Sequence, residues 1–337
     1  MSTVPGTSTG FVRTVCGDIL PEDVGFTHCH EHTFILSGPS SRINPDLLLD
    51  DLEKTTAELG EFFAAGGRTV VDAQPIGPER SPQLQRAASE RSGVHIVATT
   101  GFHRPVYYEP SHFRFRERAE ELAARLVAEI TEGMTEYDGS GGGTGRVFDG
   151  RAGNTQIRAG LLKFASDYHL IDAQAEKAAE AVAIAHQRTG APILTHTEFG
   201  TCGLEQVKLF RKLGVRPSAL LISHLDRNPD LAVHEEIADS GAYLVYDGVS
   251  RIKHHPDSTI VQLICRLAEA GLASRVLLGM DMGPRSMWRA YGGGPGMTYL
   301  GNVFLLSLRK AGLGSEQISM FTECNPASAL TFRRPAA

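Results

Sequence analysis

The chain has 337 residues, of which 42% are hydrophobic and 21% charged, so it can bury a large core and is not a disordered protein. Its net charge of −6 argues against a nucleic-acid-binding protein and against a polybasic membrane-surface protein. No apolar run reaches the about 18 residues of a transmembrane helix, and the N-terminus lacks the features of a secretory signal. The five cysteines are scattered without a CxxC pair, so we expect free thiols and a cytoplasmic protein.

Apolar runs of strand length alternate along the chain with segments of helical periodicity. The predicted strands are Val24–His30, Thr69–Gln74, His95–Gly101, Ile157–Ala165, Pro192–Thr197, Leu220–His224, Ala242–Tyr246 and Arg275–Met280. The predicted helices are Asp46–Ala65, Arg116–Glu132, Asp172–Arg188, Leu204–Leu213, Pro229–Ser240, Ser258–Ala270 and Gly301–Ala311. Several strand runs are almost continuously apolar, which is typical of parallel strands buried on both faces.

This alternation predicts an α/β fold, a (β/α)8 TIM barrel, as one domain over residues 1–337. An open doubly wound sheet is the alternative, but no Gly-rich dinucleotide fingerprint follows the first predicted strand. The Gly-rich segment Asp138–Asn154 lacks the GK[ST] ending of a phosphate loop, and we interpret it as a surface loop.

Side chains that could bind a metal follow the ends of the predicted strands, where the functional residues of such barrels lie. They are His28, His30 and His32 on the first strand, Lys163 on the fourth, His196 on the fifth, His224 on the sixth and Asp281 on the eighth. Because strand side chains alternate, the three histidines of the first strand can all face inward, and two of them can chelate one metal. The spacing does not decide which two. Imidazole and carboxylate ligands favour zinc or another first-row divalent ion.

Lys163 lies among apolar residues, where an unpaired charge is costly. It could be a Schiff-base nucleophile, as in an aldolase. It could also react with CO2 to form a carbamate that bridges two metals. The second interpretation is favoured because the charges then balance beside the histidines and the aspartate.

Together these motifs are similar to the phosphotriesterase branch of the amidohydrolase superfamily, from near residue 11 to near residue 332. The matching motifs are Gly25-Phe26-Thr27, His30-Glu31-His32, Gly160-Leu161-Leu162-Lys163, Thr195-His196-Thr197, His224 with Asp226, Asp281, and Asn325-Pro326-Ala327. Each motif is weak alone, but the ordered set is highly specific.

The resemblance implies a binuclear centre and a hydrolase that attacks its substrate with a metal-bridging hydroxide. It places the paired metal ligands of the first strand at His30 and His32. His28 is then expected to lie in the barrel core or beside the ligands. Asp281 would also accept the proton of the hydroxide and pass it to the leaving group. The implied ligands are His30, His32 and Asp281 for one metal and His196 and His224 for the other, with N6-carboxylated Lys163 bridging the two.

The expected substrate class follows from positions at which this chain differs from the organophosphate-hydrolysing members of the family. Organophosphate-hydrolysing members carry a histidine where this chain has Gly248, and an acidic residue where it has Arg227. The segments 247–253 and 285–296 instead resemble the sugar-lactonase branch, which includes members acting on phosphorylated furanose lactones. Barrels often bind phosphate after the seventh and eighth strands, so Lys253 and Arg285 are the expected phosphate ligands.

We therefore expect a lactonase that opens a sugar lactone, with a phosphorylated lactone as an extension of that hypothesis. The alternatives are a phosphotriesterase, an amidase acting on an acylated small molecule, and a non-catalytic binding protein. The intact ligand set argues against the last. The expected partner is a small-molecule substrate, with no nucleic acid and no membrane; a homodimer is left open.

Overall fold

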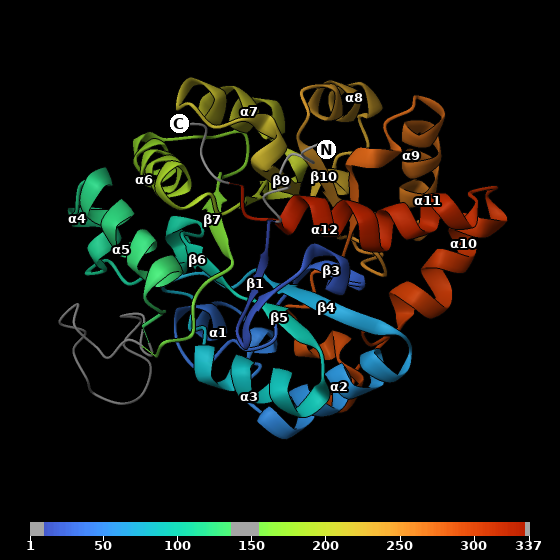
Figure 1. Cartoon of the computed structure of the whole chain (residues 1–337), viewed down its shortest axis with the longest axis horizontal. Coiled ribbons are helices and arrows are strands. Elements are labelled where there is room, and N and C mark those ends of the chain that lie inside the picture. Colours follow the sequence, from blue (N-terminus) through green and yellow to red (C-terminus); the bar gives the residue numbers. More distant parts are fainter. Residues whose placement is uncertain (1–9, 136–154, 334–337) are drawn as a thin grey trace, which may run out of the picture.

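The computed structural model describes residues 10–135 and 155–333, which form a parallel β-barrel surrounded by helices (Figure 1). The barrel strands are β3 (Phe26–Glu31), β4 (Gly67–Asp72), β5 (His95–Val97), β6 (Thr99–Gly101), β7 (Leu161–Ala165), β8 (Ile193–His196), β9 (Leu220–Ser223), β10 (Tyr243–Tyr246) and β11 (Val276–Leu278). They pair in parallel as two arcs, β3-β4-β5 and β6-β7-β8-β9-β10-β11. Because only Ala98 separates β5 from β6, these two form one barrel strand, and the predicted TIM barrel is confirmed. The predicted loop Asp138–Asn154 lies outside the described residues.

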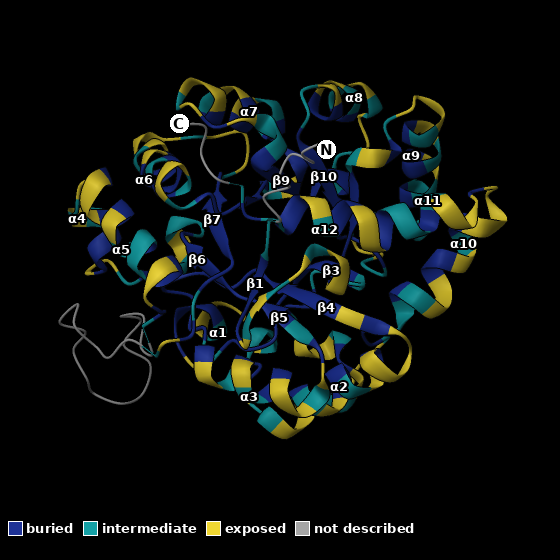
Figure 2. Cartoon of the chain, viewed as in Figure 1, coloured by how far each residue is buried: buried dark blue, intermediate teal, exposed yellow. Residues whose placement is uncertain are grey.

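The helices cover the outside of the barrel. Their bounds are α1 (Pro39–Ile43), α2 (Leu52–Ala64), α3 (Pro82–Ser92), α4 (Phe113–Arg116), α5 (Ala119–Thr131), α6 (Ala173–Thr189), α7 (Gly203–Lys212), α8 (Leu231–Asp239), α9 (Asp257–Glu269), α10 (Leu305–Lys310), α11 (Ser315–Ser319) and α12 (Asn325–Leu330). Figure 2 shows the barrel strands mostly buried and the outward surfaces of the helices exposed. No helix in the described ranges combines the length and apolarity that crossing a membrane requires.

Local sequence explains where the longer helices begin and end. The side chain of Asp51 accepts a hydrogen bond from the Lys54 amide at the start of α2, and Asp172 caps α6 in the same way. Helix α6 ends at Gly190, whose φ of 75° is readily adopted only by glycine. Such caps satisfy amides and carbonyls that have no partner within a helix.

Apolar side chains fill the barrel below its polar end. This interior cluster includes Cys29, Val71, Val97, Leu161, Leu194, Leu221, Val245 and Leu277. Lys163, His196 and Asp247 each lie two residues after a member of the cluster, so they share its inward face one layer higher. The interior cluster therefore supports the polar layer from beneath.

The opposite end of the barrel is closed by the first and last secondary-structure elements of the described chain. The hairpin of β1 (Val12–Thr14) and β2 (Gly17–Ile19) contributes Val12 to the interior cluster, and α12 contributes Leu330. In Figure 1, β1 and α12 cross in front of the strands. Among the described residues, this plug fills the amino-terminal end of the barrel, and the carboxyl ends of the strands remain open to a ligand.

Regular alternation, which would allow His28, His30 and His32 all to face inward, does not hold in β3, and His28 is the core residue that the family resemblance implies. The register of β3 against β4 shifts between His28 and Glu31, so side chains do not alternate regularly there. The His28 ring lies 4.7 Å from the ring of Phe62 on α2, measured between centroids, and thus faces the helix layer. His28 is a core residue, and the bulge lets His30 and His32 both face the barrel mouth.

We predict that Leu330→Ala lowers the free energy of unfolding by about 2–5 kcal/mol, because it leaves a cavity in the fully buried plug. Urea unfolding measures the change. Leu306→Ala on α10 is the control, since that side chain is 48% exposed and its loss should change stability by no more than about 0.5 kcal/mol. Equal effects of the two substitutions would contradict the plug.

Candidate active site

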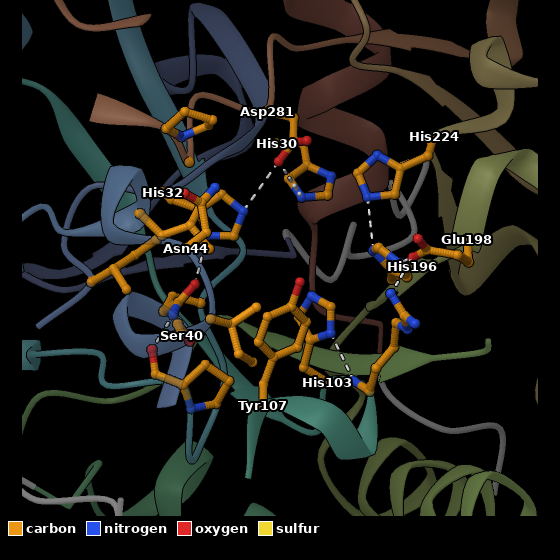
Figure 3. Close-up of a pocket in the computed structure, with 18 of the residues that line it drawn as sticks. His30, His32, Ser40, Asn44, His103, Tyr107, His196, Glu198, His224 and Asp281 are labelled. Atoms are coloured by element: carbon orange, nitrogen blue, oxygen red, sulfur yellow. Dashed lines mark hydrogen bonds and ion pairs between the residues drawn. The ribbon is translucent and has the colours of Figure 1, made fainter. Parts of the chain in front are cut away.

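A pocket of about 340 Å³ opens at the carboxyl ends of the strands, a size that suits a small molecule. Five of the six predicted metal ligands line it: His30, His32, His196, His224 and Asp281. The sixth, Lys163, is fully buried. Figure 3 shows His30, His32 and Asp281 together on one side, with His196 and His224 beside them. The structure thus brings residues from five strands to one end of the barrel.

Two overlapping groups of side chains have ligand atoms within 4.8 Å of one another. In the first, Asp281 Oδ1 lies 3.2 Å from His32 Nε2 and 3.8 Å from His30 Nε2. The second joins His30 and His224 to Asp247. His196 Nδ1 lies 2.9 Å from His224 Nε2, so two imidazole nitrogens face each other there. These nitrogen and carboxylate donors fit divalent metal ions such as zinc.

Asp247 fixes the two central imidazoles. Its Oδ2 lies 2.9 Å from His30 Nδ1, and its Oδ1 lies 2.7 Å from His224 Nδ1. Burial alone would raise the pKa of Asp247, but His224 and His30 outweigh burial and hold it well below the usual range. The His224 contact is a hydrogen bond, whereas the His30 contact is an ion-pair approach. With both Nδ1 atoms turned to Asp247, the Nε2 atoms are left for a metal. Sequence reasoning missed this role, although the inward position of Asp247 after β10 could have revealed it.

Glu198 plays a similar part for His196. Its Oε2 lies 2.8 Å from His196 Nε2 and 2.7 Å from Arg104 Nη1. Burial lowers the pKa of His196 to about 4, so the ring is neutral at pH 7. With Nε2 turned toward Glu198, Nδ1 is the nitrogen directed at His224. Neither Glu198 nor Arg104 was expected from the sequence, because both belong to loops after strand ends.

Two guanidinium groups hold Asp281. Arg227 Nη2 lies 2.6 Å and Arg251 Nη1 lies 2.8 Å from its Oδ2. Burial raises the pKa of Asp281, but Arg251, His32 and Arg227 together lower it well below its ordinary value. From the family resemblance, organophosphate-hydrolysing members are expected to carry an acidic residue at the position of Arg227. In this chain the position therefore carries a cation that forms a direct ion pair with Asp281.

Lys163 is the buried centre of the site. Its Nζ has no hydrogen-bond partner among the residues that the structure describes. Burial lowers the pKa of Lys163 to about 8, while Asp281 and Asp247 oppose the shift. An appreciable fraction of the amine is therefore neutral near pH 7, and a neutral amine is a nucleophile.

The two predicted phosphate ligands lie in different places. Lys253 is exposed and lines the pocket, together with Arg104, Arg227 and Arg251. Arg285 is not among the lining residues; its Nε lies 3.9 Å from Asp46 Oδ1 on the surface. Of the two expected phosphate ligands, the pocket lining thus contains Lys253 and not Arg285.

We predict that Asp247→Asn loosens one of the two central imidazoles, because an amide has a single acceptor oxygen where the carboxylate has two. The buried unsatisfied donor should cost about 1–3 kcal/mol of stability in urea unfolding. In proton NMR of the metal-free protein, the protected Nδ1–H signal of either His30 or His224 should disappear. Exposed Asp239→Asn is the control, and retention of both signals in Asp247→Asn would refute the bridging role.

Comparison with known proteins agrees with this geometry. The model of the phosphotriesterase family matches residues 10–330. A phospho-furanose lactonase of Mycoplasmopsis synoviae is 34% identical over 332 residues, which cover 96% of this chain and 92% of that protein. A phosphotriesterase homology protein of Escherichia coli is 31% identical, covering 90% of this chain and 97% of that protein. The crystal structure of a lactonase from Listeria monocytogenes has a TM-score of 0.87 and 30% identity, covering 96% of this chain and 99% of that one. The chain belongs to the phosphotriesterase family.

Proposed function

We propose that the protein is a metal-dependent lactonase that opens a sugar lactone, and that its substrate carries a phosphate group. The observation that carries this proposal is the composition of one pocket. A set of imidazole and carboxylate donors lies at its base, and a wall of cationic side chains from Arg104, Arg227, Arg251 and Lys253 lies beside it. The similarity to the phospho-furanose lactonase of Mycoplasmopsis synoviae supports the same substrate class.

The donor set supports a binuclear centre, with zinc as the proposed metal. His30, His32 and Asp281 would hold one ion, and His196 and His224 the other. Lys163, carboxylated on its amine, would lie between them. Two observations favour this assignment: the Lys163 amine is buried without a hydrogen-bond partner in the described residues, and CO2 reacts with neutral amines to give a carbamate and a proton. The carbamate would turn a costly buried cation into an anionic oxygen donor.

Bound divalent ions lower the pKa of water from 15.7 toward about 7 and polarise a carbonyl oxygen. The residues of the chain supply orientation and proton transfer. Asp281 is the proposed proton acceptor for the attacking water. As the water oxygen bonds to the carbonyl carbon and the ring C–O bond breaks, Asp281 would return that proton to the ring oxygen. Arg227 and Arg251 keep its carboxylate in place.

The cationic wall determines the proposed substrate. Arg251 and Arg227 form ion pairs with Asp281. Among the described residues the Lys253 ammonium forms no ion pair, and its side chain is exposed at the pocket. Lys253 is therefore the proposed contact for the substrate phosphate. Organophosphate-hydrolysing members of the family carry a histidine at the position of Gly248. This chain does not have that histidine side chain.

We predict about two equivalents of divalent metal per chain in protein purified without chelator, measured by elemental analysis. Lys163→Ala should lose metal and lactonase activity together, and short carboxylic acids should partly restore both. Lys212→Ala, which changes an exposed lysine on α7, is the control and should retain both. An active wild-type preparation without metal, or a borohydride-trapped substrate adduct on Lys163, would contradict the carbamate and favour a Schiff base.

We also predict that Lys253→Ala lowers kcat/KM for a phosphorylated furanose lactone by about 10–150-fold, because a charge-assisted hydrogen bond is lost. Turnover of the same lactone without phosphate should barely change. Arg285→Ala is the matched control, since its side chain lies outside the pocket lining, and it should leave both substrates unaffected. Equal losses on the two substrates would refute the phosphate contact. Rapid turnover of an aryl phosphotriester without lactone turnover would refute the lactonase.

A further inference from the structure

Glu31 is a buried residue between the proposed metal ligands His30 and His32. Its carboxylate binds backbone amides on both sides of a third proposed ligand, Asp281. Its Oε1 accepts a hydrogen bond of 2.8 Å from the amide of Met280, and its Oε2 accepts one of 2.8 Å from the amide of Met282. Its side chain has no exposed surface. The carboxylate therefore spans Asp281 without touching the Asp281 side chain.

Asp281 has a backbone conformation that requires support. Its φ is +48°, in the left-handed region that non-glycine residues rarely adopt. Its own amide donates to His30 O at 3.0 Å, between the two amides bound by Glu31. Successive N–H groups of a regular strand point to opposite neighbours, but here three in a row point to β3. Such a left-handed turn forms a concave set of amides that binds an anion.

The same contacts close the barrel. Strands β3 and β11 are the ends of the two paired arcs, and no backbone ladder joins them in the described part of the chain. The Glu31 carboxylate supplies acceptors where a neighbouring strand would otherwise offer carbonyl groups. The register shift in β3 that faces His30 and His32 toward the pocket also brings Glu31 to this seam.

His28 completes the arrangement. Its Nδ1 lies 2.8 Å from Glu31 Oε1, and both side chains are fully buried. A carboxylate that already accepts two amides acts as an acceptor, so Nδ1 of His28 is the donor. The ring packs against Phe26 and Phe62, which fixes its direction. His28 thus adds a third donor to the Glu31 carboxylate, at the oxygen that also accepts the Met280 amide.

We propose that Glu31, oriented by His28, is a positioning residue for Asp281. Its carboxylate holds the left-handed turn at Met280–Met282 and so directs the Asp281 carboxylate toward His30 and His32. The consequence for metal binding rests on the proposed function, in which Asp281 is a ligand. The consequence for the backbone does not, since it concerns the metal-free chain.

Glu31→Gln tests this role, because the glutamine side chain has only one acceptor oxygen. Its NH2 group would face the backbone N–H of either Met280 or Met282, which could then not donate to it. Glu58→Gln is a matched control. Glu58 is also a buried glutamate, and it accepts the amides of Ala290 at 2.9 Å and Met297 at 2.8 Å, outside the pocket lining. The two variants remove the same kind of contact, so a general loss of stability should affect both.

Amide hydrogen exchange of the metal-free proteins is the first measurement. Glu31→Gln should exchange at Met280 or Met282 at least about tenfold faster than wild type, and Glu58→Gln should do so only at Ala290 or Met297. Metal titration is the second. Glu31→Gln should bind one of two metal equivalents about 10–100-fold more weakly, the usual effect of losing support for a ligand, with kcat reduced and KM little changed. Glu58→Gln should bind both as wild type does.

Unchanged exchange at Met280 and Met282 in Glu31→Gln would overturn the proposal. So would faster exchange with unaltered metal affinity and kcat, which would make Glu31 merely structural. If Glu31→Gln does not fold, His28→Leu can be used, because it removes only the imidazole donor to Glu31. This variant should give smaller changes in amide exchange and metal affinity, in the same direction. Wild-type values of both in His28→Leu would overturn the proposal. A wild-type protein that binds no metal would refute the proposed function, while the exchange measurement would still decide the backbone role.

Discussion

Burial of the Lys163 amine is the constraint on which the rest of the site depends. The side chain projects inward from β7 above a layer of apolar residues, and its Nζ has no hydrogen-bond partner in the described residues. A buried charge is tolerated only where nearby groups compensate it. Asp247 and Asp281 supply opposite charge from the ends of β10 and β11, and burial shifts the pKa of the amine to about 8. The position thus favours an amine that is readily modified or readily deprotonated.

The carboxylates of Asp247, Asp281 and Glu31 share a second property: each is held by at least two donors. Asp247 contacts the Nδ1 atoms of two imidazoles, Asp281 contacts two guanidinium groups, and Glu31 accepts two backbone amides. Groups fixed before the substrate binds need not reorganise during the reaction, which is the main electrostatic advantage of an enzyme site over water. The same arginines make one wall of the pocket positive, which suits an anionic substrate.

Much of this arrangement could be predicted from the sequence, because parallel strands produce a regular pattern. Apolar runs and intervening helical segments predicted the barrel, and residues at strand ends must converge there. Regular alternation failed at His28, where the bulge in β3 turns the side chain to the helix layer. Arg285 and Arg227 lie on loops, whose directions depend on tertiary contacts rather than on a repeating pattern. Glu31 could not be identified from composition, since its partners are backbone amides about 250 residues away.

The central claim is that Lys163 acts as a carbamate within a metal centre. Carbon-13 NMR of protein prepared with 13C-labelled bicarbonate tests it directly. If Lys163 is carboxylated, the metal-loaded protein gives one carbamate signal, which is absent from Lys163→Ala and is lost when the metal is removed. A metal-loaded, active enzyme without that signal would show that Lys163 is not a carbamate.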